Sequence, residues 1–153
     1  NNTIWPPAHG TQAGAGMLRY LSYTVTPGEA AYVVSRPFDL STRPIATASP
    51  FSFYFYREST WAGFYDSISV FISTDPTLDA GDTRLPENGS GAMNIPRHSA
   101  YAPAVGADGW YQYTYIIPAG AAWSISNVYV IIKATSRRIS ITKQYQRWYW
   151  QHQ

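Results

Sequence analysis

The chain has 153 residues, enough for one domain with a continuous core. Aromatic residues make up 16% and charged residues 13%, which excludes intrinsic disorder, because that state is typical of low hydrophobicity with high net charge. The long charge-free stretch between Asp108 and Lys133 is interrupted by proline, glycine and polar residues, which excludes a membrane-spanning helix there and predicts no membrane insertion.

The net charge of +2 is unevenly distributed along the chain. Residues 1–108 carry six arginines and nine acids, a balance of −3, whereas residues 109–153 carry five basic residues and no acid. One interpretation is a chance division in a small chain. The other is a basic C-terminal element that meets an acidic surface on another copy, a polyanion or a glycan.

The first half of the chain alternates between turn signals and short strand patterns. Residues 1–17 hold prolines and glycines without apolar periodicity, which predicts an extended N-terminal arm. β-branched and aromatic residues predict two strands, at 18–26 and at 30–36. The first of them stops at the turn residues Pro27-Gly28. Phenylalanine at every second position predicts a third strand at 51–56, with one fully apolar face.

Four more strands are predicted in the second half. Strict alternation marks 67–73 and 110–117, while 128–133 is apolar on both faces and should lie centrally in a sheet. A last strand is predicted at 138–142. The pattern therefore predicts an all-β fold, an antiparallel two-sheet β-sandwich or a barrel. We expect the following side chains to be buried between the sheets: Phe51, Phe53, Phe55, Ile68, Val70, Ile72, Val128, Val130 and Ile132.

The connection from residue 74 to residue 109 is far longer than a hairpin needs and is rich in acids. Carboxylates are the hard ligands that calcium prefers, so the acids of this loop are the only candidate metal ligands, the alternative being a solvated acidic loop. They are Asp75, Asp79, Asp82 and Glu87. The histidines lie far apart, cysteine is absent, and no nucleophile or carboxylate pair has catalytic spacing, so neither an enzyme nor another cofactor is predicted.

Several segments in order resemble the MAM-like jelly-roll domains called choice-of-anchor J or cleaved-adhesin domains. The resemblance covers roughly residues 14–136 and is carried by Met17-Leu18-Arg19-Tyr20, Ala31–Leu40, Phe51–Tyr56, Asp66–Asp75, Gly109–Tyr113 and Asn127–Ala134. It implies a β-jelly roll, secretion by bacteria, and a role in adhesion or binding at the cell surface.

The resemblance also implies calcium held by acids in the last strand. Here the corresponding residues, 137–141, read Arg-Arg-Ile-Ser-Ile. Cations stand where carboxylates would be needed, so we expect that inherited site to be empty.

Two positions are candidates for glycosylation. Asn88 begins an Asn-Gly-Ser sequon in the long loop, where a glycan is tolerated. Ser67 lies in an Asp-Ser-Ile triplet that resembles the acceptor of some bacterial O-glycosylation systems, although an ordinary strand start explains that triplet as well.

The chain divides into an arm (1–17), a jelly-roll domain (18–142) and an aromatic tail (143–153). Exposed rings in a tail favour aggregation unless the tail docks, either on its own domain or by adding a strand to the sheet edge of a neighbour. The candidate inter-subunit residues are Trp5, Tyr145, Arg147, Trp148, Tyr149 and Trp150.

These features predict a structural, extracellular subunit that self-assembles, with jelly-roll protomers joined head-to-tail by their terminal segments into a filament or surface layer. Its partner is then another copy of itself. The alternative is a monomeric carbohydrate-binding or adhesin module of a bacterial surface protein, which would bind surface glycans through exposed rings. The chain as a whole is only mildly basic, so nucleic acid is not an expected partner.

Overall fold

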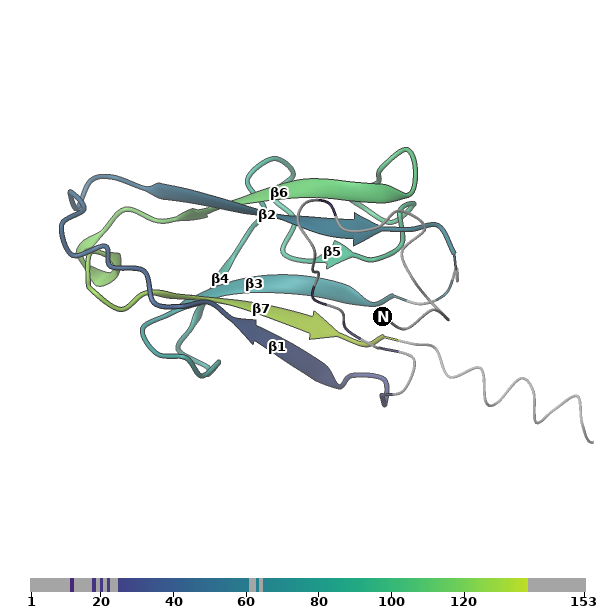
Figure 1. The fold of residues 1–153 in the computed structure, drawn as a ribbon, viewed down its shortest axis with the longest axis horizontal. Coiled ribbons are helices and arrows are strands. Elements are labelled where there is room, and N and C mark those ends of the chain that lie inside the picture. The colour runs from purple at the N-terminus through teal and green to yellow at the C-terminus, as the bar shows by residue number, and fades with distance from the viewer. Residues whose placement is uncertain are drawn as a thin grey trace, which may run out of the picture.

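The computed structural model describes residues 25–60, 63 and 65–137, together with Gln12, Leu18, Tyr20 and Ser22. These residues form two antiparallel sheets and no α-helix, which confirms the predicted all-β class and agrees with a β-sandwich (Figure 1). The jelly-roll order of strands stays a prediction.

The larger sheet has the strand order β1-β7-β3-β4, and a short β5 also pairs with β3. The smaller sheet is a single pair, β2 with β6. A 3-10 turn, η2, lies between β6 and β7. The bounds are β1 Ala30–Val34, β2 Ser49–Arg57, β3 Ser67–Ser73, β4 Thr83–Leu85, β5 Ile95–Pro96, β6 Gly109–Ile117, η2 Ala121–Trp123 and β7 Tyr129–Thr135.

The strands with clear periodicity are found where the sequence predicts them. β7, apolar on both faces, is central: it pairs with β1 on one side and with β3 on the other. The strand predicted at 138–142 lies outside the described residues. The long connection between residues 74 and 109 contains two strands that were not predicted, β4 and β5, and each buries one large side chain, Leu85 and Ile95.

The strand predicted at 18–26 is wrong for the residues that are described there. Leu18, Tyr20, Ser22, Val25 and Thr26 all lie outside strands. The Val25 amide donates to the Ser22 carbonyl three residues back, as in a turn, and the side chains of Tyr20 and Ser22 bond to other parts of the fold. Local turn bonds have replaced the sheet ladder that the β-branched and aromatic composition favours.

The turn that follows was predicted correctly. The Glu29 amide donates to the Thr26 carbonyl, and Pro27-Gly28 occupies the two central positions. Gly28 has φ of 98°, the left-handed conformation that the second central residue of a type II turn requires. This turn brings the chain onto the edge of the larger sheet, where β1 begins.

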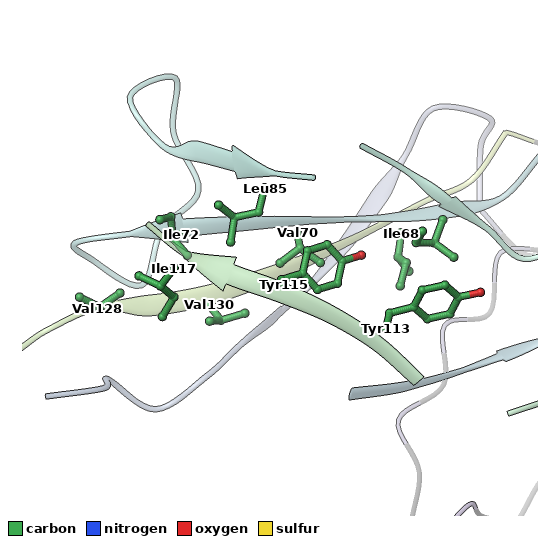
Figure 2. Packing of buried hydrophobic residues seen from close by; sticks show 10 residues of the cluster. Ile68, Val70, Ile72, Leu85, Tyr113, Tyr115, Ile117, Val128 and Val130 are labelled. Carbon is green, nitrogen blue, oxygen red and sulfur yellow. The ribbon is translucent and has the colours of Figure 1, made fainter. Parts of the chain in front are cut away.

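The core lies between the two sheets, where β3 and β7 meet β6 (Figure 2). Five of the nine side chains predicted to be buried are so: Ile68, Val70, Ile72, Val128 and Val130. The other four pack against the core but are only partly buried, namely Phe51, Phe53, Phe55 and Ile132. The smaller sheet is only two strands wide, so β2 forms its margin and the β2 phenylalanines are only partly covered. Tyr113, Tyr115 and Ile117 of β6 take the deeper positions.

Two arginines hold the ends of the β2–β6 pair. Arg57 is fully buried, and its guanidinium donates to the carbonyl oxygens of His98, Tyr101 and Pro103 and to the Tyr113 hydroxyl, at 2.7 to 2.9 Å. All four acceptors are neutral oxygens. The Arg57 side chain therefore fastens the loop before β6 to the end of β2.

Arg43 acts in the same way at the opposite end of the pair. Its guanidinium donates to Ser49 Oγ, where β2 begins, and to the carbonyl of Ile117, where β6 ends. It also reaches the carbonyls of Pro118 and Trp123 beyond that end. The small sheet is thus tied at both ends to the loops that flank it.

Val70→Ala should lower the free energy of unfolding by about 2 kcal/mol, because the side chain is fully buried and its loss leaves a cavity. Val33→Ala removes the same atoms from the same inward-facing row, but from a side chain that is 39% exposed, so a loss below about 1 kcal/mol is expected. Urea unfolding of dilute protein measures both. Equal losses would show that β1 is packed as tightly as β3.

Arg57→Ala should destabilise the domain by about 3 kcal/mol or more, because several buried oxygens lose their donor at once. Arg57→Lys keeps the charge but cannot reach all four acceptors, so an intermediate loss is expected. Arg36→Ala, at an exposed position, serves as the control and should change stability by less than about 0.5 kcal/mol. Similar effects of Arg57→Ala and Arg36→Ala on the urea midpoint would contradict the fastening role of Arg57.

Candidate interaction surface at the β1 edge

Among the described residues, β1 is an edge strand whose outer backbone groups have no hydrogen-bond partner. The Ser35 amide donates to the Val130 carbonyl, and the Ser136 amide donates to the Glu29 carbonyl, each at 2.9 Å. In an antiparallel pair, hydrogen-bonded residues alternate with residues whose backbone groups point away. Ala30, Tyr32 and Val34 therefore direct their N–H and C=O groups to the open side, and no described residue hydrogen-bonds to them.

The side chains of β1 are exposed on both faces of the sheet. Tyr32 is 52% exposed, Val33 39% and Val34 38%. Val33 lies opposite Ile132, which lies opposite the buried Val70, so Val33 points toward the smaller sheet. Its exposure means that the smaller sheet does not extend far enough to cover β1.

The outer face of β1 has a different chemical character. Tyr32 lies opposite Lys133, whose ammonium group stands 5.9 Å from the Tyr32 ring centroid. Val34 lies opposite the fully buried Ile131. On the face that points toward the smaller sheet, a strand added beside β1 would therefore meet the apolar, uncovered Val33. On the opposite face it would meet Tyr32 and Val34, with Lys133 behind them.

The other strand edges carry features that usually protect edges, whereas β1 carries none. β4 has a charged residue, Arg84, and β2 has Pro50. The free edge of β6 is occupied by the loop after β4, since the Asn88 amide donates to the Thr114 carbonyl at 2.8 Å. β1 reads Ala-Ala-Tyr-Val-Val, without charge or proline. It is the unprotected edge of the described fold.

The point where the described chain ends lies beside the start of β1. Asp66 is almost fully buried, and its carboxylate accepts from Ser22 Oγ at 2.6 Å and from the Arg137 amide at 3.0 Å, with Arg97 Nε 3.7 Å away. The Gly28 amide donates to the Ser136 carbonyl at 2.6 Å. The chain after Arg137 therefore departs from a fixed position at the end of β7.

The four acids of the long connection bond mainly within their own turns. Asp75 accepts from the Thr77 amide, Asp79 from the Gly81 amide, and Asp82 from the Asp79 amide. Glu87 lies beyond β4 and accepts from the amide and hydroxyl of Ser90. Within the described residues, no three His, Asp or Glu side chains gather into a group that could hold a metal ion.

Glu87 is a buried acid whose ionisation is coupled to the fold. Burial opposes its charge, but hydrogen bonds from the Ser90 hydroxyl and from backbone amides outweigh that effect and hold the pKa of Glu87 below its usual value. A lowered pKa in the folded state stabilises the fold above the unfolded pKa, and this contribution disappears as the pH falls through the folded value. Glu87 thus stabilises the turn beside β6 at neutral pH.

The two glycosylation candidates lie in different surroundings. Asn88 is exposed in a turn, while Ser90 of the same sequon bonds to Glu87. Ser67 begins β3 and pairs with both Thr135 of β7 and Pro96 of β5, so it is partly buried within the sheet. The geometry favours Asn88 as the accessible acceptor.

The residues predicted to join subunits lie outside the described part of the chain. They are Trp5, Tyr145, Arg147, Trp148, Tyr149 and Trp150. What the structure adds is an edge strand, β1, whose outward backbone groups pair with no described residue. Sequence reasoning missed it because alternation identifies strands but not which strand lies at an edge.

No family model, curated protein or solved structure matches the chain. The resemblance to the choice-of-anchor J domains therefore stays a prediction. None of the helical segments in the described residues has the length and apolarity needed to cross a membrane.

Chelation with EDTA should leave the melting temperature unchanged within about 2 °C, because the described acids bond to their own turns instead of converging on an ion. Differential scanning fluorimetry with and without added calcium tests this. A larger decrease with EDTA, restored by calcium, would reveal a structural calcium site.

Proposed function

We propose that this chain is a structural subunit that assembles with copies of itself outside the cell. The protomers join head-to-tail into a filament or a surface layer, with terminal segments as the connectors. The observation that carries the proposal is the β1 edge, whose outward backbone groups pair with no described residue and whose apolar side chains are exposed on both faces. Such an edge pairs readily with another strand.

Head-to-tail joining fits the separation of donor and acceptor along the chain. The acceptor would be β1, and the donor would be the segment that follows Arg137. Because these are different surfaces, two joined copies together still offer one free acceptor and one free donor, and a contact that does not close yields a filament. The acidic balance of residues 1–108 and the basic balance of residues 109–153 favour the same polarity.

A structural role is also supported by how the chemically capable side chains are used. The guanidinium of Arg57 binds loop oxygens, the carboxylate of Asp66 joins two distant segments, and Glu87 closes its own turn. Each of these polar groups contributes to holding loops in place. The extracellular location, at a bacterial surface, is part of the proposal through the adhesin resemblance.

A second candidate function, glycan binding by a monomeric adhesin module, rests on the outer face of the smaller sheet. Tyr54 is 43% exposed there, and the Tyr56 and Trp110 rings pack edge to face with centroids 5.3 Å apart. Gln112 donates to Ser52 Oγ on the same face. Rings beside amide and hydroxyl groups can stack on pyranose rings and bond to their hydroxyls.

The full chain should form polymers visible by negative-stain microscopy and should elute early in size-exclusion chromatography. Val33→Lys puts a charge on the open edge and should abolish assembly while the circular dichroism of the domain is retained. Ile45→Lys is the matched control, since Ile45 is 60% exposed in a loop, and it should still assemble.

A full chain that stays monomeric at high concentration would overturn the proposal. Binding of that monomer to a glycan array, weakened by Tyr54→Ala, would instead support the adhesin module.

A further inference from the structure

We infer that the β1 edge receives residues 147–151 of a second copy as an added antiparallel strand, with Trp148 and Trp150 facing inward beside Val33. The inference rests on the proposed self-assembly and specifies its joint. The acceptor is a described strand, in which the residues that direct their N–H and C=O groups outward are known. The donor is known only from its amino-acid sequence.

The tail has the alternation that this edge needs. In an extended strand, Trp148 and Trp150 share one face with Gln146, while Tyr145, Arg147 and Tyr149 share the other. The inner row at β1 is apolar and uncovered, so the two tryptophans belong there. A packed Trp buries about 150 to 250 Å², enough to cover Val33 and the adjacent margin of the core.

The outer face matches as well. With Trp148 opposite Val33 in an antiparallel pair, Tyr149 lies opposite Tyr32 and Arg147 lies opposite Val34. Cross-strand aromatic pairs stabilise sheets. Tyr32, Val34 and Ala30 are the residues whose backbone groups point outward, so Tyr149 and Arg147 would complete hydrogen-bonded pairs with them.

Composition favours the tail over the N-terminal arm as the occupant. Residues 138–153 carry three basic residues and no acid, whereas residues 1–17 carry no Lys, Arg, Asp or Glu. Exposed Glu29, Arg36 and Asp39 flank β1 in the sequence, so acidic and basic groups are mixed around this edge. Pro6 and Pro7 follow the only tryptophan of the arm and cannot donate to a ladder.

The direction of the strand favours a second copy over the same chain. The chain leaves β7 at Arg137, beside the start of β1, and β7 runs antiparallel to β1. Residues 138–144 span at most about 25 Å, and a tail that turns back by the shortest path meets the β1 edge in the parallel direction. A tail from a second copy has no such constraint and can form the antiparallel pairing, which is the more stable per residue.

Disulfide trapping tests the joint, because the chain has no cysteine of its own. In the proposed pairing Gln151 lies opposite Ala30 on the outer face. Chains with Ala30→Cys, mixed with chains carrying Gln151→Cys under mild oxidation, should give a mixed dimer on a non-reducing gel. Neighbouring antiparallel residues lie about 5.5 Å apart between Cα atoms, within disulfide reach. Thr77→Cys, exposed in the β3–β4 connection, replaces Ala30→Cys as the control and should give no dimer above background.

A second measurement separates the same chain from a second copy. Parallel pairing with Trp148 opposite Val33 would place Tyr145 opposite Ala30, so one chain carrying Ala30→Cys and Tyr145→Cys reports an intrachain bond at low concentration. We expect no such bond. Its formation would show that the tail belongs to its own domain and would overturn the inference.

Tail variants distinguish failure of the joint from failure of assembly. Trp148→Ala with Trp150→Ala, and separately deletion of residues 144–153, should abolish polymers while the domain stays folded; Gln146→Ala is the control and should assemble. Polymers that persist in the tryptophan variant, without the Ala30–Gln151 dimer, would overturn this joint and leave self-assembly intact. A monomeric full chain would overturn both.

Discussion

The buried guanidinium of Arg57 is the interaction on which the smaller sheet depends. A two-stranded sheet is marginal by itself, and β2–β6 has no third strand among the described residues. Arg57 compensates at one end with four hydrogen bonds to neutral oxygens, and Arg43 does so at the other. The carbonyls of the flanking loops, which would otherwise need water, are satisfied by these side chains.

The small width of the β2–β6 sheet also leaves β1 uncovered. The hydrogen bond from Asn88 to Thr114 places β6 beside the loop after β4. Its partner β2 therefore lies on the β1 side and forms the free margin of the smaller sheet. The two strands of the smaller sheet cover the middle of the larger sheet, where Val70 is fully buried. They do not reach its edge, where Val33, in the same cross-strand row, is 39% exposed. The exposed edge thus follows from the width of the smaller sheet and is not a defect of local packing.

The sequence predicts most of this architecture where alternation is strict. β2, β3 and β6 alternate inward and outward side chains at every second residue. By this alternation Arg57 shares the inward face of β2 with Phe51, so the sequence already indicates a buried arginine that a search for apolar residues alone would miss. β4 and β5 are too short to carry a period, and tertiary contacts decide their burial. The tail proposed to join subunits is picked out by composition alone, whereas the edge proposed to accept it requires the sheet order.

The length of β1 limits what the proposed joint can supply. The strand has five residues between Pro27-Gly28 and Pro37, and three of them direct backbone groups outward. Their hydrogen bonds, at a net of about 1 kcal/mol each, fix direction and register but contribute only a few kcal/mol. Most of the affinity must then come from apolar burial, which is where Trp148 and Trp150 beside Val33 become decisive. Backbone pairing would set the specificity of the joint, and the tryptophans would set its strength.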